Sequence, residues 1–354
     1  MTASPTPRLV SLATANPDHV IPQELAITHA GEIFAISHGG VARIAPIFRN
    51  ARIESRNTCA PVEWFLEDHS FSDRNNLFLE TAVDVLAKAS DDALAAAGLS
   101  FADIDTIITV CSTGIATPAL DARLMQVRPF RQDVQRMPIF GLGCAGGVLG
   151  LSRAAAMAKA EPGSHVLLLV VELCTVTFRF GDRSKSNLVA TALFGDGGAA
   201  AVISCNDNYD GKPVLGVSGE HTWPDSLDVM GWDVANDGLK VIFSRDIPAL
   251  VREDFGPIIK DFLAKQGLTL DDIDDYVCHP GGAKVLDALE EVFGLEEGAL
   301  VHSREVLRKF GNMSAVTVLF VLKATLDAGQ SGKFLLTTLG PGFTAGMMLV
   351  ETPA

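Results

Sequence analysis

The sequence predicts an α/β fold built from two similar halves. Apolar runs of strand length alternate with helical patterns, as in a parallel sheet covered by helices. A strand is expected at residues 9–13, an alanine-rich helix ended by glycine over residues 78–98, and a buried strand at residues 104–110. The chain has 354 residues, of which 48% are hydrophobic, so it can bury a large core.

An internal repeat indicates that the chain consists of two halves. Residues 94–105 (LAAAGLSFADID) resemble residues 263–274 (LAKQGLTLDDID), which lie 169 positions later. A Gly-Cys pair at 143–144, followed by a helix and a strand, aligns with a Gly-Asn pair 168 positions later at 311–312. The sequence therefore predicts a duplicated unit whose copies join at a polar, turn-rich stretch.

Cys144 is the candidate nucleophile. It lies at the predicted start of a largely buried helix, where unpaired amides and the helix dipole favour a thiolate and lower the cysteine pKa. The small residues that follow, Ala145, Gly146 and Gly147, leave room for a substrate. The alternative for a single cysteine is a small core residue without chemical function.

The two predicted halves carry different parts of one site. The first, residues 1–205, contains Cys144, and the second, residues 206–354, contains Asn312 at the equivalent helix start, so both would face a shared site. His279 follows a predicted strand and precedes two glycines, at the edge where α/β sheets bind ligands, although a histidine there can also be structural. Together they indicate a nucleophile, Cys144, that attacks a thioester with His279 as its base. His279 and Asn312 would then donate hydrogen bonds to the thioester oxygen on which negative charge develops.

The charge of the chain argues against some partners. It has 28 Lys and Arg residues, 43 Asp and Glu residues and a net charge of −15, which disfavours nucleic acid and anionic membrane surfaces. No apolar stretch reaches the roughly 20 residues of a membrane span, and no signal peptide is recognisable, so we expect a cytoplasmic protein. The six cysteines lack metal-ligand spacing, so no metal is expected. Four arginines lie close together in the N-terminal part of the chain, and they form either a solvated face or a patch for a polyphosphate such as coenzyme A. They are Arg43, Arg49, Arg52 and Arg56.

Five motifs occur in a fixed order along the chain. They are Gly143-Cys144-Ala-Gly-Gly147, Leu193-Phe-Gly-Asp-Gly197, His279-Pro-Gly-Gly282, Phe310-Gly-Asn-Met-Ser314 and Gly340-Pro-Gly-Phe343. In order and spacing the set resembles the type III polyketide synthases, the chalcone and stilbene synthase family. The resemblance implies a thiolase-like, five-layered αβαβα fold of two pseudo-duplicated halves, a homodimer, and Cys144, His279 and Asn312 as the catalytic set.

The same resemblance implies a set of cavity residues. Phe194 resembles the gatekeeper phenylalanine between the coenzyme A tunnel and the reaction cavity, and Thr117 lies in the loop that reaches the partner's cavity in that family. The remaining expected substrate-binding residues are Cys174, Thr177, Val241, Gly281, Ser314, Gly340, Pro341 and Phe343. The family's basic coenzyme A contacts do not map cleanly onto the region from Arg43 to Arg56, so none is assigned here.

The expected reaction is iterative condensation. An acyl starter passes from coenzyme A to Cys144, malonyl-CoA is decarboxylated and condensed with it repeatedly, and a cyclised product leaves, with no metal or organic cofactor. Val241 stands where the family has a phenylalanine, which favours medium- to long-chain fatty acyl-CoA starters and alkylpyrone or alkylresorcinol products. The alternatives are a single condensation, as in β-ketoacyl carrier-protein synthase III, and an idle acyl-CoA-binding paralogue.

Overall fold

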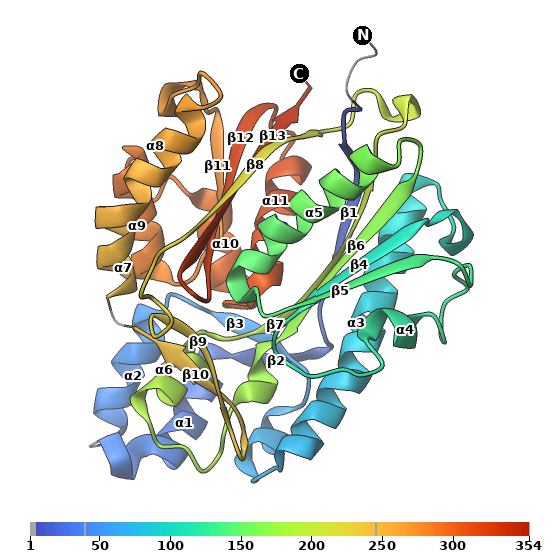
Figure 1. Cartoon of the computed structure of the whole chain (residues 1–354). Coiled ribbons are helices and arrows are strands. Elements are labelled where there is room, and N and C mark those ends of the chain that lie inside the picture. Colours follow the sequence, from blue (N-terminus) through green and yellow to red (C-terminus); the bar gives the residue numbers. More distant parts are fainter. Residues whose placement is uncertain (1–4, 39, 245, 354) are drawn as a thin grey trace.

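The computed structural model describes residues 5–38, 40–244 and 246–353, so the outermost ends of the two predicted halves, residues 1–4 and 354, lie outside the described residues (Figure 1). Nine strands form a continuous sheet in the order β11-β12-β13-β8-β1-β7-β6-β4-β5. Their bounds are β1 (Arg8–Ala15), β4 (Thr106–Cys111), β5 (Gln135–Phe140), β6 (His165–Leu173), β7 (Asp196–Ser204), β8 (Val214–Thr222), β11 (Asp275–Cys278), β12 (Gly332–Gly340) and β13 (Thr344–Thr352).

The strand order is symmetric about the centre of the sheet. There β1 meets β8 at one pair, Arg8 with Val214. On one side β4 is parallel to β6, and β6 is antiparallel to β7. On the other side β11 is parallel to β12, and β12 is antiparallel to β13. The two sides repeat one pairing pattern, as the internal sequence repeat suggests.

The sheet is mixed, which corrects the expectation of a parallel sheet. The clearest reason is the connection between β12 and β13, which consists only of residues 341–343. Such a short loop can join antiparallel strands, whereas parallel neighbours need a crossover of a dozen or more residues. The sequence pattern of alternating strands and helices does not distinguish these connections.

Helices and sheet form five layers (Figure 1). One outer layer contains α3 (Phe71–Ala97) and α4 (Leu120–Leu124), and the other contains α8 (Gly256–Ala264), α9 (Ala283–Phe293) and α10 (Val301–Phe310). Between the two sides of the sheet lie α5 (Gly146–Ala160) and α11 (Thr317–Asp327), whose apolar side chains share one core with strands from both sides. This middle layer is buried because both of its faces are apolar.

The predicted N-terminal elements are present with small changes of length. The strand expected at residues 9–13 is β1, and that expected at 104–110 is β4. The helix expected over 78–98 is α3, which begins earlier because Ser70 caps it and forms a capping box with Asp73. It ends where Gly98 adopts φ 68°.

Most of the remaining elements lie below one end of the sheet (Figure 1). They are α1 (Gln23–His38), α2 (Val41–Asn50), α6 (Lys185–Leu193), a two-stranded sheet of β2 (His19–Pro22) and β3 (Ser55–Thr58), and the hairpin of β9 (Met230–Ala235) and β10 (Gly238–Phe243). The short helix α7 (Ile247–Leu250) packs against α9. No helix within the described ranges is long and apolar enough to cross a membrane.

Candidate active site

Cys144 lies in a short 3₁₀ turn, η3 (Gly143–Ala145), between β5 and α5. This turn continues without a break into α5, which begins two residues after the cysteine, so Cys144 lies at the start of the helical region, as the sequence predicts. Gly143 has φ 46°, and a Cβ there would lie 2.5 Å from the ring of Pro341. The nucleophile turn therefore packs directly against the turn at residues 341–343.

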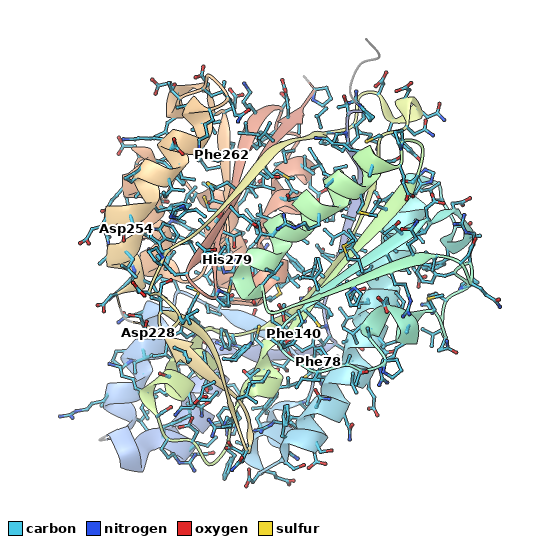
Figure 2. All side chains as sticks on the ribbon, viewed as in Figure 1. Phe78, Phe140, Asp228, Asp254, Phe262 and His279 are labelled. Carbon is cyan, nitrogen blue, oxygen red and sulfur yellow. The ribbon has the colours of Figure 1, made fainter. Side chains whose placement is uncertain are left out.

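Cys144, His279 and Asn312 line one pocket, which we call the inner pocket. Its wall also includes Met230, Phe243 and Gly281. His279 follows β11 and lies in the interior of the molecule (Figure 2). Its backbone amide donates to the carbonyl of Thr337 at 2.9 Å, which holds the residue against β12. The three residues that the sequence singled out are therefore brought together by elements far apart in the chain.

Asn312 does not lie at a helix start, which corrects the predicted equivalence with Cys144. It forms an isolated parallel bridge with Phe194, and α11 begins only at Thr317. The residue that faces Cys144 is Ser314, in the 3₁₀ turn η8 (Ser314–Val316), which packs against η3. The bridge to the end of α6 keeps Asn312 extended, so the helical region starts later than a gap-free alignment predicts.

Hydrogen bonds fix the orientation of the Asn312 side chain. Its Oδ1 accepts from the amide of Ser314 at 2.8 Å, and its Nδ2 donates to the carbonyl of Gly281 at 3.1 Å. Within the described part of the chain, the second Nδ2 hydrogen and both ring nitrogens of His279 have no protein partner. Asn312 and His279 can therefore both donate to an oxygen atom of a ligand in the inner pocket.

The electrostatics of the site differ from the sequence prediction of a resting thiolate. Burial raises the pKa of Cys144 to about 12, and the hydrogen bond to Ser314 offsets only part of that effect. Burial also lowers the pKa of His279 to about 4. Burial therefore favours the neutral form of both groups, a thiol and an imidazole that line the same pocket.

Glu172 is a buried polar residue that the sequence analysis missed. It lies near the end of β6 and accepts from the amide of Ser112 at 3.0 Å, the hydroxyl of Ser112 at 2.7 Å and the hydroxyl of Thr113 at 2.9 Å. Burial raises its pKa to about 7, and its charge contributes to the raised pKa of Cys144. A glutamate inside the otherwise apolar run VLLLVVEL was the available signal.

A second pocket, the hairpin pocket, shares Cys144 with the inner pocket. The predicted cavity residues that line it are Cys174, Phe194, Val241, Ser314 and Pro341. The ring centroid of Phe194 lies 6.3 Å from that of Trp232 on β9 and 5.7 Å from that of Phe243 on β10. The hairpin β9–β10 therefore forms one wall beside Cys144.

A third pocket is almost entirely apolar and continues from the second. Both are lined by Cys174 and Phe194, and the third also includes Thr177, Phe65 of the 3₁₀ turn η1 (Val62–Leu66), and residues of α1. We call it the apolar pocket. It leads away from Cys144 toward α1, on the far side of Phe194.

Three predicted substrate-binding residues do not line these pockets. Phe343 is buried with its ring centroid 4.7 Å from that of Trp223, and Gly340 packs against the backbone of Ala145. Thr117 precedes Pro118 in the loop between β4 and α4. Phe343 and Gly340 therefore support the turn beside Cys144, whereas the role of Thr117 in a partner's cavity stays a prediction.

The position of Arg56 differs from both alternatives that the sequence suggested. Its guanidinium is buried, where Nη1 donates to the carbonyls of Thr191 at 2.6 Å and Phe194 at 3.4 Å. Burial lowers its pKa to about 10. Arg56 therefore holds the end of α6 and belongs neither to a solvated face nor to a surface patch.

Comparison with known proteins gives a consistent result. The family description "Chalcone and stilbene synthases, N-terminal domain" matches residues 63–207, and the C-terminal domain of the same family matches residues 215–353. A 1,3,6,8-tetrahydroxynaphthalene synthase of Streptomyces peucetius is 38% identical over 88% of this chain and 84% of its own length. The Mycobacterium tuberculosis protein named alpha-pyrone synthesis polyketide synthase-like Pks18 is 29% identical over 96% of this chain and 90% of its own.

The solved structures agree with the sequence relatives. The crystal structure of 1,3,6,8-tetrahydroxynaphthalene synthase from Streptomyces coelicolor, a bacterial type III polyketide synthase, superposes with a TM-score of 0.92. It covers 98% of this chain and 99% of that one at 29% identity. The fold is the thiolase-like one that the motifs implied. The chain therefore belongs to the chalcone and stilbene synthase family, the type III polyketide synthases.

Proposed function

We propose that this type III polyketide synthase extends a medium- to long-chain fatty acyl starter with malonyl-CoA and cyclises the product to an alkylpyrone or alkylresorcinol. The observation that carries this proposal is the apolar pocket, which joins the hairpin pocket at Cys174 and Phe194. A buried methylene contributes about 0.8 kcal/mol. An alkyl chain attached to Cys144 would therefore be stabilised by extending past Phe194 into this space.

The proposed loading step uses Cys144 and His279. The thiol proton passes to His279, and the sulfur attacks the carbonyl carbon of the acyl-CoA thioester. The carbon–sulfur bond to coenzyme A breaks, and coenzyme A leaves as the thiol with the proton from His279. The starter is then a thioester of Cys144, and His279 is neutral again.

The proposed extension step uses Asn312 and His279 as donors. Malonyl-CoA loses carbon dioxide, and the electron pair of the broken carbon–carbon bond forms an enolate. Its oxygen accepts hydrogen bonds from Asn312 Nδ2 and from the N–H of neutral His279. The enolate carbon bonds to the acyl carbon and expels Cys144 as thiolate. Hydrogen bonds supply the charge stabilisation, so no metal or organic cofactor is required.

We place the entrance for acyl-CoA and malonyl-CoA at a surface groove next to the inner pocket. The groove shares Phe243 and Gly281 with that pocket and includes Lys185 and Lys284. Two ammonium groups at the rim of a chain with net charge −15 suit the phosphates of coenzyme A. This site replaces the arginine patch considered from the sequence.

We further propose a cytoplasmic homodimer in which a second copy covers the side of the molecule near β5. Support comes from exposed apolar side chains there, with Phe140 at 59% exposure, Val127 at 50% and Ile115 at 45%. Thr117 lies two residues after Ile115, so its loop would reach the interface. Light scattering coupled to gel filtration would give twice the 37.5 kDa chain mass if this is correct, and once that mass if it is wrong.

A panel of acyl-CoA starters with malonyl-CoA tests the proposed reaction. Mass spectrometry of the products should show pyrones or resorcinols carrying an alkyl chain from decanoyl-CoA or longer esters. Products of one condensation only would favour the β-ketoacyl carrier-protein synthase III alternative. Binding of acyl-CoA without turnover would favour the idle paralogue.

A further inference from the structure

The hairpin β9–β10 forms a cavity wall without belonging to the main sheet. Among the described residues its two strands pair only with each other, with Val241 opposite Trp232 and Phe243 opposite Met230. All four side chains line the hairpin pocket beside Cys144. An isolated two-stranded hairpin is only marginally stable in water, so contacts outside the strands must hold this one in place.

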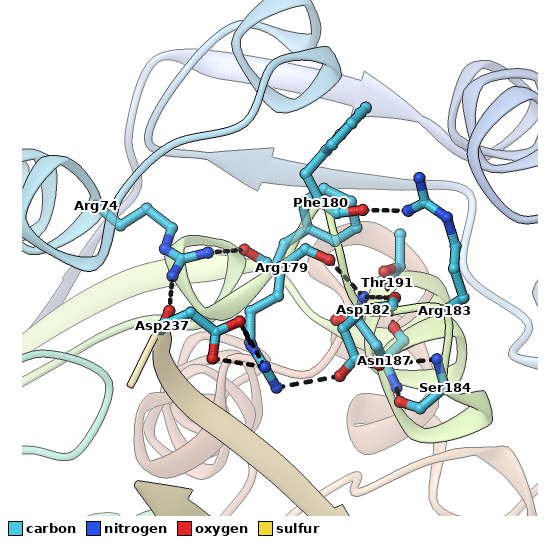
Figure 3. Close-up of polar contacts among 10 residues, drawn as sticks. Arg74, Arg179, Phe180, Asp182, Arg183, Ser184, Asn187, Thr191 and Asp237 are labelled. Atoms are coloured by element: carbon cyan, nitrogen blue, oxygen red, sulfur yellow. Dashed lines mark hydrogen bonds and ion pairs between the residues drawn. The ribbon is translucent and has the colours of Figure 1, made fainter. Parts of the chain in front are cut away.

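The turn of the hairpin is fastened by two arginines (Figure 3). Arg179 donates to both carboxylate oxygens of Asp237, from Nε at 2.8 Å and from Nη2 at 2.6 and 2.5 Å. Arg74 of α3 donates to the backbone carbonyl of the same Asp237 and to the carbonyl of Phe178 at 2.8 Å. Gly238 has φ 126°, and a Cβ there would lie 2.9 Å from the guanidinium of Arg74, so glycine permits this approach.

Arg179 is itself held by a rigid segment. Its Nη1 pairs with Asp182 at 3.1 Å, and Asp182 accepts from the amide of Ser184 at 2.8 Å. Asn187 of α6 donates to the carbonyl of Arg179 at 2.9 Å and to that of Asp182 at 2.8 Å (Figure 3). Arg179, which binds Asp237, is therefore itself held in place by hydrogen bonds at the N-terminal end of α6.

The segment that holds Arg179 also forms the cavity wall opposite the hairpin. The segment begins directly after the 3₁₀ turn η4 (Cys174–Thr177) and leads into α6, which ends at Leu193, directly before Phe194. Cys174 and Phe194 pack in one cluster with Trp232, Val241 and Phe243 of the hairpin. One pair of charged side chains thus bridges the two walls that define the space beyond Cys144.

The Arg179–Asp237 pair has the features of an effective ion pair. It is bidentate, and the Arg179 side chain is only 13% exposed, although Asp237 is 57% exposed. The guanidinium lowers the pKa of Asp237, so the carboxylate stays ionised at neutral pH. Such a pair holds its geometry better than the typical surface ion pair, whose contribution is small.

We propose that Arg179 and Arg74 are positioning residues that, through Asp237, fix the hairpin β9–β10 over Cys144 and thereby set the length of acyl chain the cavity accepts. Loss of the fastening lets Val241 and Trp232 move away from Phe194, and the cavity lengthens. The effect on chain length rests on the proposed function, whereas the claim that the two arginines fix the hairpin is independent of it.

Hydrogen exchange tests the fixing directly. Asp237→Asn keeps the shape of the side chain and removes its charge, and in peptides covering residues 230–243 we expect exchange faster by about fivefold. Asp91→Asn is the matched control, because Asp91 pairs bidentately with Arg128 at 2.8 and 2.6 Å, outside the pockets. Unchanged exchange in the hairpin of Asp237→Asn, or an equal increase in the control, overturns the proposal.

Competition between starters tests the consequence. With mixtures of decanoyl-, dodecanoyl-, tetradecanoyl- and hexadecanoyl-CoA, Asp237→Asn and Arg179→Lys should shift the optimum of kcat/KM to longer chains. A merely structural defect would lower all four values by the same factor, and that result overturns the role in specificity. If the unaltered enzyme accepts none of these esters, the proposed function fails, while the exchange measurement still decides whether the hairpin is fixed.

Discussion

The sulfur of Cys144 lies 3.5 Å from the hydroxyl oxygen of Ser314, across the contact between η3 and η8. Ser314 has φ 47°, an unusual backbone conformation for a residue other than glycine. Asn312 holds it there by accepting its amide hydrogen at 2.8 Å. A strained residue maintained next to the nucleophile indicates that the position of the Ser314 hydroxyl matters for the thiol.

The neutral state of Cys144 predicts a steep pH dependence of its alkylation. With a pKa of about 12, the thiolate fraction, and hence the rate with iodoacetamide, should rise about tenfold per pH unit from pH 7 to 9. Peptide mapping identifies the labelled site, and Cys144→Ser gives the background from the other five cysteines. A rate that is flat from pH 6 upward would instead mean that Cys144 and His279 form a resting ion pair.

Asn312→Ala should slow malonyl-CoA decarboxylation by about 10²–10³-fold, the usual cost of one lost oxyanion donor. Loading of the starter on Cys144 should survive better. Asn57→Ala is a suitable control, because Asn57 donates to the carbonyl of Pro17 and lines none of the three pockets. Release of carbon dioxide from labelled malonyl-CoA measures the step, and a normal rate in Asn312→Ala would remove the proposed role.

Val241→Phe should shorten the preferred starter. The larger ring would fill space between Trp232 and Phe194 in the hairpin pocket. Val234→Phe adds the same atoms to the same hairpin, but Val234 is 72% exposed and lines none of the pockets, so it serves as the control. Relative kcat/KM values for decanoyl-CoA and longer esters provide the readout. An unchanged chain-length preference in Val241→Phe would argue against this wall as a determinant.

The raised pKa of Glu172 should make the free energy of unfolding depend on pH. Its pKa is raised to about 7 by burial, above the ordinary value of 4.5, so between these values the folded chain keeps a proton that the unfolded chain has lost. Stability should therefore fall as pH rises through this window, by an amount on the order of 3 kcal/mol from Glu172. Urea unfolding at pH 5 and pH 7 at a fixed protein concentration measures it.

The variant Glu172→Gln should flatten this dependence, because the amide has no charge to bury. Glu220→Gln is the control, since Glu220 is half-exposed and pairs with Arg153 at the surface. If Glu172→Gln retains the full loss of stability between pH 5 and pH 7, other groups cause it.

Much of this site could be predicted from the sequence because its local signals are strong. Cys144 follows a glycine at a predicted helix start, His279 lies between a predicted strand and two glycines, and the structure places both in one pocket with Asn312. The type of each element was predictable wherever apolar periodicity was long, as in α3. The family resemblance supplied the order of the motifs and the layered fold.

Other features depend on contacts that the sequence does not contain. The neutral state of Cys144 results from burial by both halves, which outweighs the helix dipole that the local sequence suggests. The position of Asn312 depends on its bridge to Phe194, 118 residues earlier. The fastening of Asp237 by Arg74 and Arg179 joins three separate segments, and no local pattern marks these residues as partners.

The most direct test of the central claim is the mass of the acylated protein. After brief incubation with decanoyl-CoA alone, intact-protein mass spectrometry should show one decanoyl group per chain, and peptide mapping should place it on Cys144, with none in Cys144→Ala. A decanoyl group on Cys174, or acylation that persists in Cys144→Ala, would contradict the account.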